Sequence, residues 1–163
     1  MTAYSVSVRH NFETAHRLPH LAGKCMNLHG HSWWMEAKVS APELHAGAIV
    51  EFGALKARVR EWIDTNLDHG AMLGAADPLV DVLTEHKSKV YRFGAPDPEG
   101  AEHLASGLAH PTVEAVAELI ARVVDDALRD LPSAPGARVA EVTVRETHVN
   151  SASWCQSEKD PDL

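Results

Sequence analysis

Three residues of the stretch CMNLHGH, Cys25, His29 and His31, have side chains that can bind a metal ion or move a proton. The two histidines are two residues apart, so in an extended strand their imidazoles point to the same side of the sheet. Such a pair can share one metal ion if a third ligand approaches from a neighbouring strand. The same spacing also occurs on ordinary strands with surface or packed histidines, so the pair alone leaves both interpretations open.

The third ligand that the sequence offers is His16, in the segment HNFETAHRLPH. It stands at the end of the preceding predicted strand, where an antiparallel partner would bring it beside the histidine pair. Three neutral imidazoles leave one coordination position open, as catalytic zinc sites do and structural four-ligand sites do not. The pattern therefore predicts a catalytic type of metal centre.

Cys25 precedes the histidine pair by four residues, and its type allows several roles. It can be a fourth ligand, a nucleophile or a base, and a nearby cation would favour the reactive thiolate form. A free cysteine is also often a small buried hydrophobe. The spacing does not decide between these roles.

Asp68 and His69 end the first predicted helix, in the segment NLDHGAML. The structural interpretation is a helix terminus, at which His69 complements the helix dipole and Gly70 releases the chain. The functional interpretation is a carboxylate that orients an imidazole for proton transfer, although adjacent residues do not always face each other.

Glu146 continues the apolar face of its predicted strand, because it shares parity with Val142 and Val144. An unpaired charge on such a face is costly. Either the strand leaves the core there, or the carboxylate awaits a cation or the paired N–H donors of a heterocycle. Thr112 and Glu114, at the start of the second predicted helix, are explained by a helix cap and a dipole partner.

The elements that must position these side chains show in the periodicity of the chain. Alternating apolar and polar residues predict strands, and apolar residues at helical spacing predict helices. In chain order, we expect strands over 4–16 and 31–40, helices over 52–67 and 113–131, and strands over 139–147 and 151–156.

This order predicts an α+β fold, with a four-stranded antiparallel sheet and both helices packed on one face. We expect a single domain over 1–163, with an enlarged insert between the helices at about 74–110. The insert is rich in Gly, Pro and Ala, so we expect it to be mostly loop, with a short ordered excursion around Tyr91.

Composition restricts the class of protein. A formal charge of −8 argues against a protein that holds nucleic acid or an anionic membrane through a basic surface, although a small anionic substrate remains compatible. We expect a cytoplasmic protein with reduced thiols, because no signal peptide or membrane span is evident and the two cysteines lie far apart. The 11 histidines suggest metal or proton chemistry.

Together these features resemble the 6-pyruvoyl-tetrahydropterin synthase and 6-carboxy-tetrahydropterin synthase family. The matching stretches keep the family's order and cover most of the chain outside the insert: FETAHRLPH, CMNLHGHS, IVEFGALK, LDHGAML, HPTVEAVAELI and VTVRET. The resemblance implies the tunnelling fold, in which subunits join side by side into a barrel. It also implies a homohexamer, built as a dimer of trimers, with active sites at subunit interfaces.

The resemblance further implies a role for each candidate residue. In the family's pattern, His16, His29 and His31 hold Zn²⁺; Cys25, Asp68 and His69 are catalytic; Glu146 anchors the pterin ring; and Thr112 and Glu114 line the pocket.

The implied substrate is 7,8-dihydroneopterin triphosphate. The C-x3-H-x-H spacing resembles the carboxy branch, which releases triphosphate and acetaldehyde and leaves 6-carboxy-5,6,7,8-tetrahydropterin, a precursor of 7-deazapurines such as queuosine. The alternatives are a 6-pyruvoyl product, an aldolase-like activity on dihydroneopterin, or a non-catalytic pterin-binding homologue. The chain departs from compact members in its insert, in Glu51 where aspartate is common, and in His148 where cysteine tends to occur.

Overall fold

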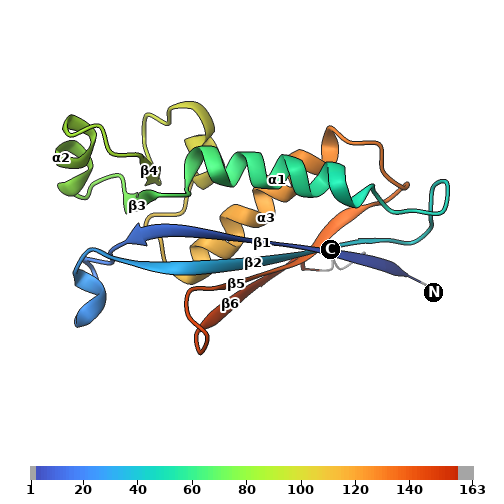
Figure 1. Cartoon of the computed structure of the whole chain (residues 1–163), viewed down its shortest axis with the longest axis horizontal. Helices are drawn as coiled ribbons and strands as arrows, with labels where there is room; N and C mark the ends of the chain where they lie inside the picture. The colour runs from blue at the N-terminus through green and yellow to red at the C-terminus, as the bar shows by residue number, and fades with distance from the viewer. Residues whose placement is uncertain (1–2, 158–163) are drawn as a thin grey trace, which may run out of the picture.

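One curved sheet of six strands forms the body of the molecule, and its two long helices lie together on one face (Figure 1). The structure, a computed structural model, describes residues 3–157. In chain order the elements are β1 (Tyr4–His16), the 3-10 turn η1 (Lys24–Met26), β2 (His29–Ala41), α1 (Phe52–Asn66), β3 (Gly70–Gly74), α2 (Leu79–Glu85), β4 (Val90–Phe93), the 3-10 turn η2 (Gly100–Ala105), α3 (Val113–Arg129), β5 (Arg138–Arg145) and β6 (Ser151–Cys155).

Strands β1 and β2 form the long antiparallel pair that carries the site. Their register runs without a break from Tyr4 opposite Ala41 to His16 opposite His29. Burial alternates along both strands, as a sheet with one covered face requires. The buried parity of β1 includes Phe12 and His16, so the histidine lies on the face that the helices cover.

The helices cover this face with apolar stripes and begin at residues that cap them. Helix α3 buries eight side chains, including Ile120 and Val124, and each fully buried aliphatic side chain contributes about 1.5–3 kcal/mol. Thr112 caps α3 by accepting the Ala115 N–H. Glu51 caps α1 by accepting the N–H groups of Gly53 and Ala54, so glutamate fills the capping role that aspartate often has.

The prediction of a four-stranded antiparallel sheet, with elements in the order strand, strand, helix, helix, strand, strand, is wrong. The sheet is mixed, in the order β4-β3-β1-β2-β5-β6. Only β1, β2, β5 and β6 are mutually antiparallel as expected, because β3 pairs in parallel with β1 and β4 in parallel with β3. Both added strands are short. Strand β3 is largely buried and lacks the alternation that marks a half-buried strand, whereas β4 alternates over only four residues.

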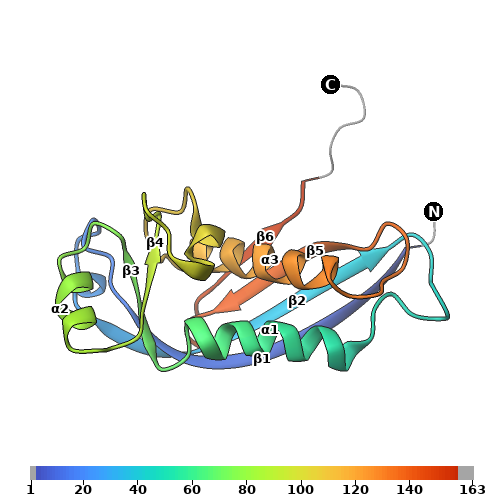
Figure 2. The same cartoon turned by 90° about the horizontal axis from the view of Figure 1, so that it is seen from above.

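The insert is an ordered mixture of loop and short regular elements. It contains α2, β4 and η2, and its predicted ordered excursion around Tyr91 is β4. The Tyr91 hydroxyl donates to the Ala101 carbonyl at 2.8 Å, and Arg92 pairs with Glu102 at 2.7 Å. With β3, the insert gathers at the end of the sheet where β1 finishes (Figure 2).

The predicted single domain has bounds of 1–163, and its ends at 1–2 and 158–163 lie outside the described residues. Within the described range, none of the helices has the length and apolar character that a membrane crossing requires.

Candidate active site

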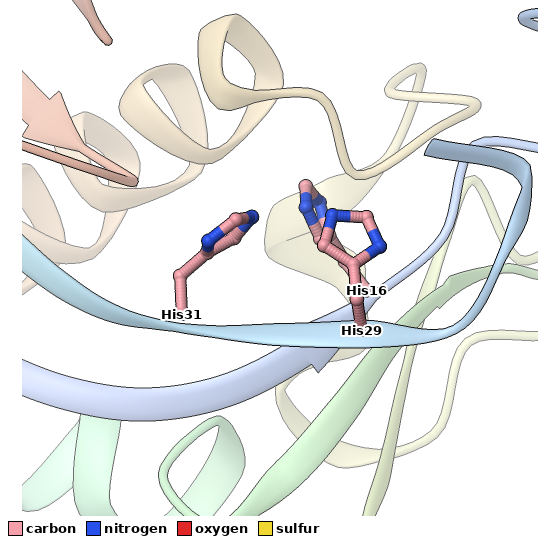
Figure 3. A group of neighbouring side chains, drawn as sticks. All are labelled: His16, His29 and His31. Carbon is pink, nitrogen blue, oxygen red and sulfur yellow. The ribbon is translucent and has the colours of Figure 1, made fainter. Parts of the chain in front are cut away.

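The three histidines come together at one end of the β1–β2 pair. Figure 3 shows their imidazoles projecting to the same side of the strands. One ligand atom from each of His16, His29 and His31 lies within 4.8 Å of the others. The prediction that an antiparallel partner brings His16 beside the other two is confirmed by the register, which places it opposite His29.

Backbone carbonyls orient two of the rings. Nδ1 of His16 donates to the Pro111 carbonyl at 2.8 Å, and Nδ1 of His29 donates to the Asn27 carbonyl at 2.7 Å. Since each carbonyl accepts only an N–H, both rings carry their proton on Nδ1 and offer the Nε2 lone pair to a ligand. Sequence reasoning missed Pro111 and Asn27, because a backbone carbonyl leaves no signal in residue type.

The histidine cluster fits a metal ion. Nε2 of His16 and Nε2 of His31 are buried and have no hydrogen-bond partner, which is uncommon for polar atoms in a folded protein. Burial is the main cause that lowers the pKa of His16 and of His31, despite the opposing effect of Glu146. Both rings are therefore held in the neutral form that binds metals.

Trp33 supports the cluster from below. Its side chain is fully buried, and its indole N–H donates to the Thr14 carbonyl at 3.0 Å. The indole meets His16 edge-on with ring centroids 4.9 Å apart, and it meets His31 in the same way at 5.6 Å. This packing restricts the orientation of the His16 and His31 rings.

Glu146 faces the same cluster from the end of β5. Its Oε2 lies 3.8 Å from Nε2 of His16 and 3.9 Å from Nε2 of His31. The strand ends at Arg145, so the chain is leaving the sheet there, and the carboxylate faces two imidazoles that can bind a metal ion. Glu146 lines a cavity of about 710 Å³ that also includes Gly30, His31, Ser32, Trp34, Arg145, Thr147 and His148.

Asp68 and His69 form a hydrogen-bonded pair. Nδ1 of His69 donates to Oδ2 of Asp68 at 2.7 Å. The contact depends on the backbone of His69, whose φ of 56° is left-handed, a conformation that costs a residue with a Cβ about 1–2 kcal/mol. The Glu13 N–H donates to Oδ1 of Asp68 at 2.8 Å. The two residues therefore follow the end of α1, as the structural interpretation expects, and their side chains also face each other, as the functional interpretation expects.

The electrostatic surroundings keep Asp68 ionised. Burial raises the pKa of its carboxyl, but the hydrogen bonds from the Glu13 N–H and from His69, together with the charges of His69 and Lys89, lower it by more. The net pKa lies below its usual range, so the carboxylate is available to hold the imidazole across the neutral pH range.

Among the described residues, the remaining candidates are not part of the three-histidine group of a single chain. Among the described residues, no hydrogen bond or ion pair joins the Asp68–His69 pair to the three histidines, and the His69 side chain is 78% exposed. Cys25 lies exposed on η1. Thr112 acts as the cap of α3, and Glu114 is exposed in its first turn.

Comparisons with known sequences agree on one family. A profile described as 6-pyruvoyl tetrahydropterin synthase matches residues 5–157. A relative from Halobacterium salinarum, named probable 6-carboxy-5,6,7,8-tetrahydropterin synthase, is 32% identical over 126 residues, which cover 77% of this chain and 73% of the relative. A 6-carboxy-5,6,7,8-tetrahydropterin synthase from Rickettsia typhi is 34% identical over 86 residues, covering 51% of this chain and 62% of the relative.

Solved structures share the fold. The 6-pyruvoyl tetrahydropterin synthase of Plasmodium vivax superposes with a TM-score of 0.65 at 19% identity, over 97% of this chain and 100% of that chain. The enzyme of the same name from Caenorhabditis elegans gives a TM-score of 0.61 at 22% identity, over 96% and 98%. At these identities the likeness establishes the architecture of the chain.

Proposed function

Because this chain belongs to the 6-pyruvoyl tetrahydropterin synthase family and is an enzyme of the pterin synthase type, we propose that it forms 6-carboxy-5,6,7,8-tetrahydropterin. The substrate would be 7,8-dihydroneopterin triphosphate, with triphosphate and acetaldehyde as the other products, and the pathway would lead to 7-deazapurines of the queuosine type. The observation that carries the proposal is the cluster of three histidines beside Glu146. The names of the relatives favour the carboxy branch over the pyruvoyl branch.

His16, His29 and His31 would hold Zn²⁺. Three nitrogen ligands with a remaining open position are the donor set of a catalytic zinc site. When bound, the ion supplies Lewis acidity, which polarises hydroxyl groups of the substrate side chain and makes the neighbouring positions more acidic. The carbonyls of Pro111 and Asn27 would keep two of the rings in the orientation that binding needs.

Glu146 would bind the pterin ring. A carboxylate can accept two parallel N–H donors from one edge of a heterocycle, and such charge-assisted bonds are stronger than neutral ones. The cavity of about 710 Å³ that it lines has the size of a small-molecule site and extends from His31. Substrate bound there would have its ring at Glu146 and its side chain toward the imidazoles.

Cys25, Asp68 and His69 would move the protons. The Cys25 thiolate would remove a proton from the substrate side chain as a general base. Asp68 fixes the proton of His69 on Nδ1, which leaves Nε2 of His69 free to accept and return a proton. Thr112 and Glu114, at the start of α3, would form part of the pocket wall in addition to capping the helix.

The assembly that we propose is a homohexamer, a dimer of trimers with active sites between subunits. Two observations support it. Cys25 and His69 are exposed in the single chain and are not part of the three-histidine group, so a second copy can contact them. Within the described residues, β1 pairs with β3 only from Thr14 onward, and Glu13 bonds to Asp68 and His69, so the outer edge of β1 before Glu13 remains open for another strand.

Product analysis tests the function. The zinc-loaded protein is incubated with 7,8-dihydroneopterin triphosphate, and the pterin, triphosphate and acetaldehyde are followed by mass spectrometry and coupled assays. We expect all three products in equal amounts. A 6-pyruvoyl product without acetaldehyde would move the chain to the pyruvoyl branch, and absence of turnover in folded, zinc-bound protein would reject the proposal.

A further inference from the structure

Lys89 reaches from the insert to the end of helix α1. It precedes β4, and its ammonium group donates to two backbone carbonyls, that of Asp64 at 2.8 Å and that of Asp68 at 2.7 Å. The last turn of α1 contains no basic residue of its own. Lys89 therefore supplies, from a distant part of the sequence, the cation and the donors that a helix C-terminus needs.

The Lys89 ammonium contacts the peptide group that links Asp68 to His69, the candidate catalytic pair. The carbonyl of this peptide group belongs to Asp68 and accepts from Lys89, while its N–H belongs to His69 and donates to the Glu13 carbonyl at 2.6 Å. Both polar ends of one peptide group are thus fixed by partners from other elements. This restricts rotation on both sides of the group, including the φ of His69, which is left-handed at 56°.

The aliphatic part of the Lys89 side chain lies over Gly70. A Cβ at Gly70 would lie 3.0 Å from Cγ, Cδ and the carbonyl oxygen of Lys89, which is too close for an ordinary contact. The Lys89 carbonyl also accepts the Ala71 N–H at 3.0 Å. Gly70 therefore leaves the space that the lysine occupies where it crosses the chain, in addition to any role in ending the helix.

We propose that Lys89 is a positioning residue: by fixing the Asp68–His69 peptide group together with Glu13, it holds the Asp68 carboxylate against the His69 imidazole. The inference rests on the proposed function in that it takes this pair to be catalytic. The inference also gives the insert a role in the reaction, because Lys89 belongs to the insert and contacts the end of α1.

The charge of Lys89 adds to its geometric effect. The groups that face Asp68 are the His69 imidazole, the Glu13 backbone N–H and the Lys89 ammonium, and all of them stabilise the carboxylate. A cation beside the pair also opposes its protonation. Loss of the charge should therefore move the acid side of the rate profile to higher pH, a change that a purely structural contact would not cause.

The test compares Lys89→Met, Lys89→Arg and Lys56→Met in the full-length, zinc-loaded protein. Methionine keeps the packing over Gly70 but has no donor and no charge, whereas arginine keeps both. Lys56→Met is the matched control, because it removes one charge from an exposed position of α1, the helix whose end Lys89 contacts. The measurements are kcat and KM across pH, thermal stability, and hydrogen–deuterium exchange of the amide of His69.

For Lys89→Met, we expect kcat to fall about tenfold at unchanged KM, because the pair is misplaced while substrate binding is intact. The acid limb of the rate profile should move up by roughly half a pH unit, which is the size of an exposed ion-pair effect. Exchange at the His69 amide should accelerate, Lys89→Arg should recover most of the loss, and Lys56→Met should match the wild type.

Two results would overturn the inference. One is a Lys89→Met protein with the wild-type rate, pH profile and His69 exchange. The other is a rate loss that Lys89→Arg does not relieve and that follows thermal stability at constant pH profile, which would make the contact merely structural. If the wild-type protein does not turn over dihydroneopterin triphosphate, the proposed function fails, and hydrogen exchange at His69 in the same three variants still decides whether Lys89 holds the pair.

Discussion

His16 stands directly opposite His29 across the β1–β2 pair, with their ring centroids 4.7 Å apart. The candidate metal site therefore depends on one cross-strand contact plus a same-face neighbour, His31. A slip of one residue in this register would place the His16 side chain on the other face and dismantle the site. The buried faces of the two strands, which lie beneath the helices, specify the register.

Replacing a ligand should remove the metal. We expect His29→Ala to purify with little zinc and to lose at least about a hundredfold in rate, because two imidazoles bind the ion weakly. Adding zinc at a hundred times its dissociation constant should stabilise the metal-free wild type by about 2.7 kcal/mol and the variant much less. Elemental analysis and thermal unfolding measure both effects, with His45→Ala, an exposed histidine, as control. Full zinc content in His29→Ala would exclude this residue as a ligand.

Glu146→Gln separates substrate binding from metal binding. The neutral amide keeps the shape but loses charge-assisted acceptance of the ring N–H groups, so KM should rise about ten- to a hundredfold with a smaller change in kcat. Zinc content should stay at the wild-type level. The control is Glu141→Gln, whose residue lies on β5 and lines a cavity on the opposite face of the sheet. Loss of zinc from Glu146→Gln would instead identify the carboxylate as a metal ligand.

Cys25→Ala tests the base. If the thiolate removes the substrate proton, kcat should fall about 10²- to 10⁴-fold, while zinc and substrate still bind. Elemental analysis and the binding of a substrate analogue check the last point. Cys155→Ala, which changes the other exposed cysteine, should be active. An active Cys25→Ala enzyme would assign the proton transfer to another residue.

The fold of the insert should depend on pH through Glu102. Burial raises the pKa of this carboxyl, but the hydrogen bond from Arg92 and the other donors lower it by more, so its net pKa is below the usual value. A lowered pKa in the folded state contributes stability that is present above the unfolded-state pKa and is lost as pH falls through the folded-state pKa.

We therefore expect Glu102→Gln to destabilise the protein by about 2 kcal/mol at pH 7, since Arg92 loses its two-oxygen partner. The difference from the wild type should shrink as pH falls through the lowered folded-state pKa, where the wild-type carboxyl becomes protonated. Denaturant unfolding at a series of pH values measures it. Glu85→Gln, on the exposed surface of α2, should behave as the wild type at every pH. A difference that is constant with pH would show that the charge of Glu102 contributes nothing.

The sequence predicted the parts of the fold that carry a regular pattern. Strands β1 and β2, helices α1 and α3, and the meeting of three histidines follow from periods of two and of about three and a half residues. Strand β3 escaped prediction because it has five residues and little alternation. Strand β4 alternates but has only four residues, so the sequence indicated it only as a short ordered excursion around Tyr91. The predicted four-stranded sheet therefore lacks β3 and β4, although its four antiparallel strands are present.

The contact between Asp68 and His69 was beyond prediction for a different reason. It depends on one left-handed residue whose backbone is held by Glu13 and Lys89, which come from other strands or loops. Neither partner lies close to the pair in sequence, so spacing left the structural and functional interpretations open. The approach of Cys25 and His69 to the histidine cluster stays a prediction, because it needs more than one chain.

The position of Trp33 beneath His16 and His31 makes the site observable by light. An indole that touches two candidate ligands edge-on should change its emission when the imidazoles bind an ion, and a paramagnetic ion such as Co²⁺ at that position should quench it strongly. Metal binding to the three histidines can therefore be followed by tryptophan fluorescence, without substrate and without a label.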